Sequence, residues 1–328
     1  MRILVTGGAG YIGSHTVKLL LSRGHDVRVL DSLVYGHRAA VPAERLTVAD
    51  LSDAPAVDQL ILAHRIEAVL HFAAFAAVGE SVKHPGRYWQ NNLVNTLTLL
   101  DLCRRHGVNR FVFSSTCATY GLPEKMPITE DTPQRPINPY GQTKLAVERA
   151  LADYAAAYGI GYAALRYFNA AGAAADGSIG EDHHPETHLI PLVLQVALGQ
   201  RPHIEVFGTD YPTPDGTCIR DYIHVEDLAE AHLLALEKIE PGKGLCVNLG
   251  TGRGYSIREV IKTAEQVTGK PIAVKDGPRR PGDPPQLVAA ADKARQVLGW
   301  SPRYSELKPI VETAWSWHRS HPHGYADR

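Results

Sequence analysis

The chain has few cysteines and no long apolar run. Its 328 residues include four cysteines, none of them in a C-x-x-C pair, so neither a disulfide framework nor a cysteine-ligated zinc site is expected. No apolar run approaches the roughly 20 residues that a membrane-spanning helix needs. The N-terminus enters a strand-like segment directly, without a charged and then apolar leader. We therefore expect a cytosolic protein with reduced cysteines.

The chain also lacks an excess of charge of either sign. It has 34 lysines and arginines against 35 aspartates and glutamates, for a formal net charge of −1, and the two signs are interspersed. Such a balance gives no electrostatic footprint for nucleic acid or an anionic membrane, so neither is expected as a partner. The length suits two coupled domains.

A glycine-rich turn stands close to the N-terminus. Residues 1–6 read as a buried strand, and Gly7-Gly8-Ala9-Gly10-Tyr11-Ile12-Gly13 follows at once, before a helix expected from about Ser14 to Arg23. Glycines permit a sharp turn and a close backbone approach to a pyrophosphate, while the helix N-terminus supplies N–H donors. The pattern predicts a bound dinucleotide, contacted by Gly7, Gly10, Tyr11, Ile12 and Gly13.

The next strand indicates which dinucleotide is bound. Residues 26–30 read as this strand, and Asp31 follows it, at the distance where a carboxylate meets the adenosine ribose hydroxyls. Asp31 would repel a 2′-phosphate, so NAD is favoured over NADP, although Arg38 lies nearby and softens this preference.

Strands and helical stretches then alternate, which predicts an α/β fold with a Rossmann-type doubly wound parallel sheet. Residues 68–74 and 110–116 read as two further strands, and the second ends in Ser114, Ser115 and Thr116. Ligands of such sheets sit at the carboxyl ends of the strands. This places Phe72, Ala73 and Ala74, together with the three hydroxyls, beside the cofactor.

A tyrosine and a lysine share one face of a predicted helix. Asn138-Pro139 opens this helix, and Tyr140 and Lys144 follow at a spacing of four. A tyrosine has a pKa of about 10, and an adjacent ammonium favours its phenolate. A bound nicotinamide cation would act in the same direction. The pair therefore predicts a base beside the dinucleotide.

Taken together, these motifs resemble the extended short-chain dehydrogenases/reductases, and among them the nucleotide-sugar 4-epimerases of the UDP-glucose (UDP-galactose) type. The resemblance covers nearly the whole chain. It is carried by residues 5–15, 78–81, 139–141, 165–169, 216–225, 247–250 and 279–283.

The resemblance implies a reaction and the residues that perform it. Tyr140 would take the proton of the sugar 4-hydroxyl while the C4 hydride passes to tightly held NAD, and the 4-keto sugar would turn over and take the hydride back on its other face. Thr116 would hydrogen-bond the reacting oxygen and the tyrosine. Lys144 would hold the nicotinamide ribose and lower the tyrosine pKa. Further cofactor contacts are implied for Asp50, Leu51, Asn91 and Phe168.

The resemblance also implies a UDP-sugar site in the second half of the chain. Arg220 and Arg280 match diphosphate-binding arginines, whose guanidinium groups suit bidentate contact with phosphate oxygens. Phe207 matches a position against the uracil. The remaining implied substrate positions are Asn169, His188, Leu189, Asp283 and Leu287.

Three residues depart from patterns seen in the family. His188 stands where some members have asparagine. Ala76 stands where some have a lysine near the pyrophosphate or nicotinamide, so the cofactor is expected to be held less tightly. Leu287 occupies the position that limits sugar size, and we expect it to disfavour N-acetylated sugars.

A histidine-rich stretch, Glu181-Asp182-His183-His184 with His188, offers ligands of the kind that bind zinc or manganese. The expected chemistry needs no metal, and flanking glycine favours a solvated polar loop. We therefore predict no metal site here, and an exposed tail for the C-terminal histidines.

Several alternatives remain open. Residues 115–121 and 124–129 resemble members that also turn over UDP-xylose and UDP-arabinose, so a pentose activity or a dual activity is one alternative. Sugar dehydratases and decarboxylases of this superfamily carry carboxylates after the threonine, where this chain has Cys117-Ala118. A non-catalytic NAD-binding sensor is the alternative of another class.

The predicted organisation is an NAD-binding domain over residues 1–168 and a UDP-sugar-binding domain over 169–328, with a segment near 219–240 returning to the first. Many relatives dimerise through two helices of each subunit. The helix around Asn92 to His106 and the helix that carries Tyr140 are candidates, so we expect a homodimer.

Overall fold

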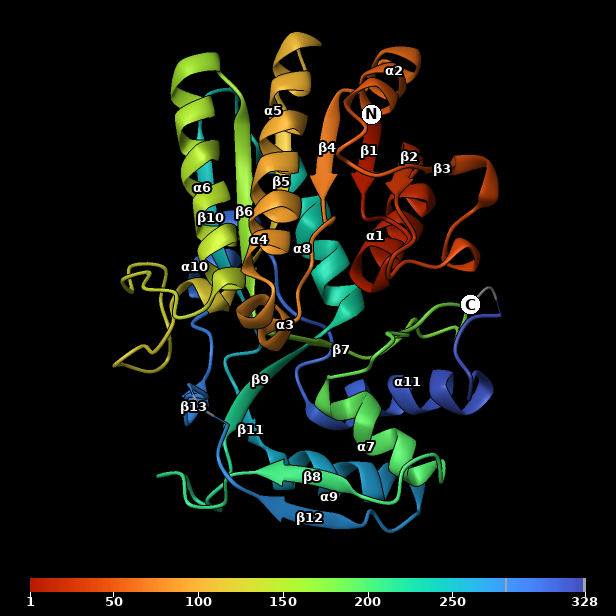
Figure 1. The fold of residues 1–328 in the computed structure, drawn as a ribbon, viewed down its shortest axis with the longest axis vertical. Helices are drawn as coiled ribbons and strands as arrows, with labels where there is room; N and C mark the ends of the chain where they lie inside the picture. The colour runs from red at the N-terminus through yellow and green to blue at the C-terminus, as the bar shows by residue number, and fades with distance from the viewer. Residues whose placement is uncertain (281, 327–328) are drawn as a thin grey trace.

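The computed structural model of the protein describes residues 1–280 and 282–326, and its centre is a seven-stranded parallel sheet (Figure 1). The strands are β1 (Arg2–Thr6), β2 (Asp26–Asp31), β3 (Leu46–Val48), β4 (Ala68–His71), β5 (Arg110–Thr116), β6 (Gly161–Tyr167) and β10 (Gly244–Leu249). Their order across the sheet is β10-β6-β5-β4-β1-β2-β3, and every pairing is parallel. This is the predicted doubly wound α/β fold.

Helices cover both faces of this sheet, which explains why its central strands are apolar almost throughout. One face packs against α1 (Tyr11–Ser22), α8 (Val225–Lys238) and α10 (Asp292–Leu298). The other packs against α2 (Ala54–His64), α5 (Asn95–Arg105) and α6 (Pro139–Tyr158). None of the described helices is long and apolar enough to cross a membrane.

A second, smaller layer system lies beyond the carboxyl ends of the large sheet (Figure 1). Its strands are β7 (Asn169–Ala171), β8 (Ile204–Phe207), β9 (Ile219–His224), β11 (Gly254–Ser256), β12 (Val274–Gly277) and β13 (Gln286–Leu287). Its helices are α7 (Leu189–Ala197), α9 (Ile257–Thr268) and α11 (Leu307–Ser320), and these pack around a separate apolar core.

The chain passes more than once between the two layer systems. After β9, helix α8 and strand β10 return to the large sheet, so residues 225–249 overlap the segment near 219–240 for which a return was predicted. The division of the chain into domains at residue 168 stays a prediction.

Two of the predicted elements begin or end three residues away from their predicted bounds. Helix α1 begins at Tyr11 instead of Ser14, because the last part of the glycine-rich turn is already helical. Strand β4 ends at His71 instead of Ala74, because the N–H groups of Phe72 and Ala73 both donate to the carbonyl of Thr6 and the ladder stops there.

Candidate active site

The order of the strands reverses between β1 and β4, and the glycine-rich turn lies at this point. Gly7 has a φ of 69°, and a Cβ placed on it would lie 2.5 Å from the backbone nitrogen of Ala73. A Cβ on Gly13 would lie 2.2 Å from the carbonyl oxygen of Gly7. Only glycine fits at these two positions, and the backbone forms a crevice where open α/β sheets bind their ligands.

Helix α1 starts inside this crevice. Its N-cap is Gly10, which provides no side-chain cap. The N–H groups of a first helical turn have no partners within the helix, and they carry the positive end of its dipole. Tyr11 opens the helix, and its hydroxyl donates to the carbonyl of Gly172 at 2.7 Å, which fixes the turn against the second layer system. The uncapped helix end fits a dinucleotide pyrophosphate.

Asp31 stands at the end of β2, next to the same turn. Its Oδ2 accepts from the backbone N–H of Ala9 at 2.9 Å, and its Oδ1 accepts from that of Leu33 at 2.8 Å. Burial raises the pKa of this carboxyl, and the two N–H donors oppose that rise. Asp31 therefore braces the glycine-rich turn as well as standing where the ribose contact was predicted. Arg38 lies exposed seven residues further on.

The remaining predicted cofactor residues line the same edge of the sheet. Asp50 and Leu51 follow β3, with Asp50 exposed and Leu51 buried. Phe72, Ala73 and Ala74 follow β4, and Phe168 follows β6. Asn91 lies in a π-helical segment, Trp89–Val94, of the type often found at functional sites, and donates to Asn92 Oδ1 at 2.9 Å. Contacts of these residues with a cofactor stay a prediction.

Thr116 and Tyr140 meet at the carboxyl end of β5. Thr116 is the last residue of the strand, and its Oγ1 accepts from the N–H of Ala118 at 3.1 Å. Tyr140 lies in the first turn of α6, whose N-cap Asn138 accepts from the N–H of Gly141 at 2.9 Å. Burial raises the pKa of Tyr140, and its contact with the Thr116 hydroxyl opposes that rise. The structure thus brings together the two residues predicted to act on one substrate oxygen.

Lys144 lies one turn further along α6 and is almost wholly buried, with 3% of its surface exposed. Its Nζ donates to the carbonyl of Ser114 at 2.8 Å and lies 4.8 Å from the centre of the Phe113 ring. Burial lowers the pKa of this amine to about 7, while the charge of Glu148 acts to raise it. Lys144 is thus held in a fixed position beneath the hydroxyl-ended strand.

The pKa of Tyr140 differs from the expectation that Lys144 lowers it. Burial raises the pKa of Tyr140 above the usual value, and Tyr167 and Cys117 add to the rise. The physical reason is that both members of the Tyr-x-x-x-Lys pair are desolvated, and the lysine ammonium donates to the Ser114 carbonyl. Two factors favour the phenolate: the contact with the Thr116 hydroxyl, and the position of Tyr140 in the first turn of a helix, where the dipole stabilises an anion by about 0.3–1 kcal/mol.

A buried polar network lies beside this pair, and the sequence did not reveal it. Arg166 binds Glu148 at 2.6 Å, and both side chains are buried. Ser115 donates to Glu148 at 2.5 Å. Arg166 also donates to the hydroxyl of Tyr120 at 2.9 Å. The only hint in the sequence is that Glu148 follows Lys144 by one helical turn.

Most of the predicted substrate residues gather in the second layer system. Arg220 of β9 pairs in register with Leu287 of β13 and forms an ion pair with Asp283. The guanidinium of Arg280 lies 3.9 Å from the centre of the Phe207 ring. Cys117, next to Thr116, packs against the same small buried cluster as Leu287. This group therefore lies near the end of β5. Pro281, within the matching segment 279–283, lies outside the described residues.

Phe168 and Asn169 connect the two groups. Phe168 packs in a small buried cluster with Tyr120, Ile128 and Ala289, against which Leu287 also packs. Asn169 donates through Nδ2 to the carbonyl of Asp221 at 3.0 Å. The residue predicted to limit sugar size therefore lies beside a predicted cofactor residue.

The histidine-rich loop before α7 is not the solvated segment that we expected. Glu181 and Asp182 are buried, because the loop is covered by α11 and the residues after it. A Cβ on Gly180 would lie 2.3 Å from the Trp317 ring, and the N–H of Tyr325 donates to Asp182 at 2.9 Å. His188, predicted as a substrate contact, is half exposed and turns its Nδ1 to Glu186 at 2.9 Å, while Leu189 starts α7.

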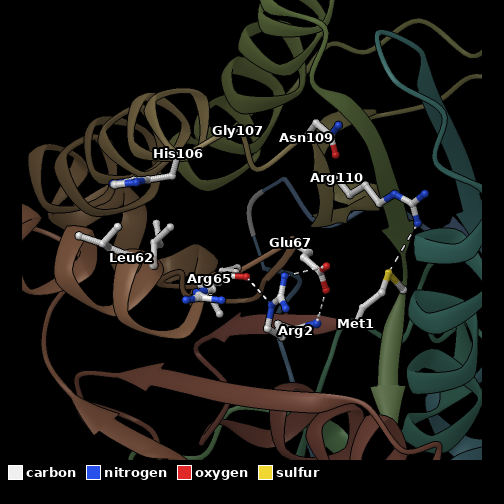
Figure 2. Close-up of a pocket in the computed structure, with 11 residues that line it drawn as sticks. Met1, Arg2, Leu62, Arg65, Glu67, His106, Gly107, Asn109 and Arg110 are labelled. Carbon is white, nitrogen blue, oxygen red and sulfur yellow. Dashed lines mark hydrogen bonds and ion pairs between the residues drawn. The ribbon is translucent and has the colours of Figure 1, made fainter.

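A hollow of about 570 Å³ lies at the opposite, amino-terminal edge of the sheet (Figure 2). It is lined by residues at the starts of β1 and β5 and before β4. Its Arg2 is already paired with Glu67 at 2.9 Å and with the carbonyl of Arg65 at 2.7 Å. Ligands of open α/β sheets bind at the other edge, so this hollow is not the candidate active site.

Comparisons with known proteins agree with this arrangement. Residues 3–250 match the model of the NAD dependent epimerase/dehydratase family. A UDP-glucose 4-epimerase of Halalkalibacterium halodurans is 54% identical over 99% of this chain and 98% of its own length.

Solved structures are similar as well. A UDP-glucose 4-epimerase from Brucella ovis in complex with NAD is 52% identical, with a TM-score of 0.93 over 96% of this chain and 97% of that one. A UDP-glucose-4-epimerase from Stenotrophomonas maltophila with bound NAD and formylated UDP-arabinopyranose is 42% identical, with a TM-score of 0.94 over 98% of this chain and 99% of that one.

Proposed function

The chain belongs to the NAD dependent epimerase/dehydratase family, and from that premise we propose that it is an NAD-dependent UDP-sugar 4-epimerase that interconverts UDP-glucose and UDP-galactose. The observation that carries the proposal is the meeting of Thr116 and Tyr140 above a buried Lys144, at the edge where the strand order reverses. Relatives about half identical over their full length are UDP-glucose 4-epimerases.

The cofactor of the proposed reaction is NAD, which supplies a reversible hydride acceptor for C4 of the sugar. The uncapped start of α1 and the glycines at 7 and 13 suit its pyrophosphate. Asp31, Asp50 and Leu51 would hold the adenosine end. Ala76, exposed before α3 (Val78–Lys83), supplies no cation there, so we propose that the cofactor exchanges more readily than in members with a lysine.

Within this site, Tyr140 would take the proton from the sugar 4-hydroxyl at its Oη and later return it. Thr116 would hold that hydroxyl in line, because its Oγ1 lies at the end of β5 next to the phenol. Lys144 would hold the nicotinamide ribose. Deprotonation of Tyr140 has to overcome its burial, so the proposed role needs positive charge brought into the site together with the helix dipole.

The nucleotide part of the substrate would lie along β8, β9 and β13. Arg220 and Arg280 would bind the diphosphate, and Phe207 would lie against the uracil. Arg280 already lies over the Phe207 ring, and Asp283 orients Arg220. Leu287, beside Phe168, would leave room for a hydroxyl at the sugar but not for an N-acetyl group.

A pentose substrate is the second candidate. It is favoured by the similar structure that holds formylated UDP-arabinopyranose. A pentose lacks the 6-hydroxymethyl group, and a pocket rejects a smaller ligand poorly when no buried polar group is left unpaired. Dual activity on hexoses and pentoses is therefore compatible with the proposed site.

We further propose a homodimer in the cytosol. The two helices expected at its interface, α5 and α6, are neighbours on one face of the sheet. Trp89 and Val94, which lead into α5, are among the exposed large apolar side chains, and a shallow hollow lined by Trp89, Leu145 and Ala146 runs along α6. The four cysteines are unpaired, which suits a reducing compartment. Light scattering during gel filtration would give the mass, and a monomer would contradict the dimer.

The first experiment is to incubate the purified protein separately with UDP-galactose, UDP-arabinopyranose and UDP-N-acetylgalactosamine, with and without added NAD⁺, and to resolve the products by NMR. We expect UDP-galactose to give UDP-glucose, a measurable pentose rate, and little or no conversion of the N-acetylated sugar. If none of the three sugars is converted even with NAD⁺, the protein is not a 4-epimerase of these sugars and the NAD-binding sensor takes its place.

A further inference from the structure

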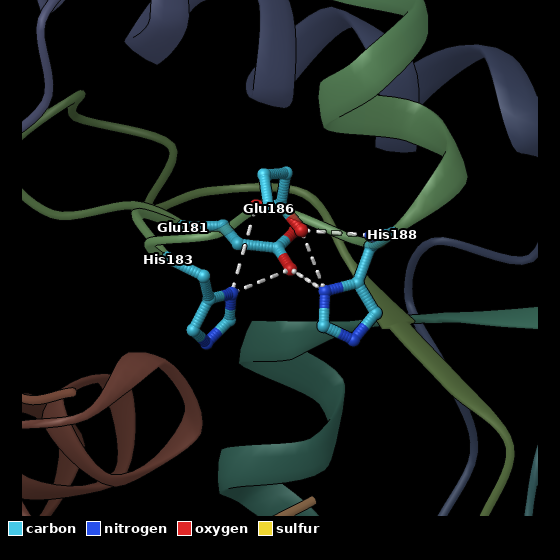
Figure 3. A group of neighbouring side chains, drawn as sticks. All are labelled: Glu181, His183, Glu186 and His188. Atoms are coloured by element: carbon cyan, nitrogen blue, oxygen red, sulfur yellow. Dashed lines mark hydrogen bonds and ion pairs between the residues drawn. The ribbon is translucent and has the colours of Figure 1, made fainter. Parts of the chain in front are cut away.

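Four side chains of the loop between β7 and α7 converge on one point (Figure 3). They are Glu181, His183, Glu186 and His188, and one ligand atom from each lies within 4.8 Å of all the others. Figure 3 shows both imidazole rings turning a nitrogen toward the two carboxylates. The set combines two imidazole nitrogens, which bind metals in their neutral form, with two carboxylate oxygens. Such a set suits a divalent transition metal.

Four of the separations within this cluster, from 2.9 to 3.6 Å, lie near the spacing of ligand atoms around a metal ion. His183 Nδ1 lies 3.3 Å from Glu181 Oε1 and 3.6 Å from Glu186 Oε2. His188 Nδ1 lies 2.9 Å from an oxygen of each of the two glutamates. In a tetrahedral zinc site with bonds of about 2.0–2.1 Å, neighbouring ligand atoms lie about 3.3 Å apart.

Hydrogen bonding within the cluster leaves some of its atoms unused. Glu181 is 3% exposed, and its Oε1 makes no hydrogen bond of acceptable geometry with any residue that the structure describes. The same holds for His183 Nδ1, a buried atom. These two atoms lie 3.3 Å apart. Buried polar atoms that lack a well-formed hydrogen bond are costly, and a bound cation would coordinate both.

The position of the cluster suggests what such an ion would do. The ring of His183 lies edge-on to Tyr11, with 6.2 Å between ring centres, and Tyr11 is the first residue of α1 in the glycine-rich turn. At its other end the cluster leads into α7, and Trp317 of α11 packs on Gly180, the residue before Glu181. The loop is thus in contact with the turn of the large sheet and with the helices of the second layer system.

We propose that Glu181, His183, Glu186 and His188 form a binding site for one Zn²⁺ ion that ties the loop before α7 to the glycine-rich turn. All four ligand positions come from the protein, so the site is a closed, structural one. The ion would order His188 and Leu189 at the start of α7, and it takes no part in the proposed hydride and proton transfers.

Metal binding can be tested without any measurement of activity. The full-length protein is freed of metal with a chelator, mixed with Zn²⁺, passed through gel filtration and analysed for zinc. The variants are His183→Gln and His188→Gln, chosen because these rings are less buried than Glu181. The matched controls are His184→Gln, next to the cluster but outside it, and His323→Gln, in the C-terminal segment.

We expect the wild-type protein and both controls to retain about one zinc per chain, and each of the two variants to bind at least roughly 100-fold more weakly. Zinc should also raise the melting temperature of the wild-type protein but not that of the variants. Co²⁺ in place of zinc should give the strong visible absorption of a tetrahedral site.

Three results would overturn the proposal. The wild-type protein retaining no zinc would mean that the cluster is a network of histidine–glutamate ion pairs. Equal retention by His183→Gln and wild type would place the ion elsewhere. A weak, octahedral Co²⁺ spectrum that the variants leave unchanged would indicate casual binding by surface histidines.

Discussion

At the scale of single residues, Tyr140 is the group on which turnover should depend most. Tyr140→Phe removes the proposed proton acceptor and its contact with Thr116 but keeps the ring, so kcat should fall by about 10²–10⁴-fold with little change in the affinity for NAD or UDP. The control is Tyr154→Phe on the same helix, whose hydroxyl donates to Asp101 at 2.9 Å and which should keep full activity. Turnover by Tyr140→Phe at more than a tenth of the wild-type rate would show that another group takes the proton.

The buried Lys144 leads to a second prediction, which concerns how the free energy of unfolding depends on pH. An unfolded lysine has a pKa of about 10.4, and in the folded protein burial lowers the pKa of Lys144 to about 7. Below pH 7 both states carry the proton, and the folded state bears the full cost of a buried charge. Between pH 7 and about 10 the folded state releases the proton while the unfolded state keeps it. The free energy of unfolding should therefore rise with pH, by about 1.4 kcal/mol per unit from this group.

The test of this stability effect is Lys144→Met, in which the pH-dependent contribution is absent. Urea unfolding of the NAD-free protein at pH 7, 8 and 9 should show the variant to be the more stable at pH 7, with an advantage that shrinks as the pH rises. Lys83→Met, at an exposed position, should follow the wild-type curve. If Lys144→Met keeps the wild-type slope against pH, the buried amine does not titrate in this range.

Residue chemistry could be read from the sequence where it depends on local spacing, and not where it depends on burial by distant parts of the chain. The proximity of Thr116 and Tyr140 was predicted because a strand end and a helix start fix both side chains. The burial of Glu181 was not predicted, because Trp317 and Tyr325, which cover its loop, are more than 130 positions away in the sequence. Glu186 was overlooked for the same reason, since nothing near it in sequence shows that it points inward.

At the scale of elements, the glycine-rich turn and α1 form one unit whose geometry has no room for a side chain. A Cβ on Gly13 would meet the backbone of Gly7 and Gly8, at 2.2 and 2.8 Å, and backbone cannot rotate away as a side chain can. Gly13→Ala should therefore shift α1 away from the turn and strain the site by about 1–3 kcal/mol. NAD binding measured by calorimetry should weaken by roughly 5- to 150-fold.

The matched control for this element is Gly86→Ala. Gly86 lies in the short helix α4 (Pro85–Tyr88), and a Cβ there would meet no atom within 4 Å. Its NAD affinity should equal that of the wild-type protein. Unchanged NAD binding by Gly13→Ala would mean that the turn can open without loss, and that the close packing of α1 on β1 is not what forms the crevice.

Elements were predictable where periodicity and caps mark them, as for β5 and α6. Asn138 and Pro139 predict the start of α6, and in the structure Asn138 is the N-cap of this helix. The start of α1 was placed three residues late, because glycines normally indicate turn and here the tight packing on Gly7 lets Gly13 be helical. Pairing across the sheet cannot be read from the sequence of one strand, and for this reason β10 was not assigned to the large sheet.

At the scale of the whole molecule, one buried network joins strands that are far apart in the sequence. Glu148 of α6 and Arg166 of β6 form its centre, and Gln134 donates to Glu148 at 3.0 Å. The network passes through the Tyr120 hydroxyl to Asn248 of β10, at 2.7 Å. Strand β10 enters the large sheet from the second half of the chain. The same network therefore holds the segment after Thr116 and the returning strand in place.

Removing only one member of the Glu148–Arg166 ion pair should lower the free energy of unfolding more than replacing both members by apolar side chains. Glu148→Leu leaves the Arg166 cation buried without its partner, which typically costs about 3–5 kcal/mol, whereas replacing both members by apolar side chains costs much less. The double variant Glu148→Leu, Arg166→Met still leaves Ser115 and Gln134 without their acceptor, at about 1–3 kcal/mol, so we expect its loss to be well below the sum of the two single losses. Urea unfolding of the NAD-free protein measures the stability of the two single variants and of the double variant.

The exposed pair of Arg253 and Glu306, 2.6 Å apart, serves as control, because Glu306→Leu should cost less than about 1 kcal/mol. Additive losses in the double variant would mean that Glu148 and Arg166 stabilise the sheet independently, and that β10 is held by its backbone ladder alone.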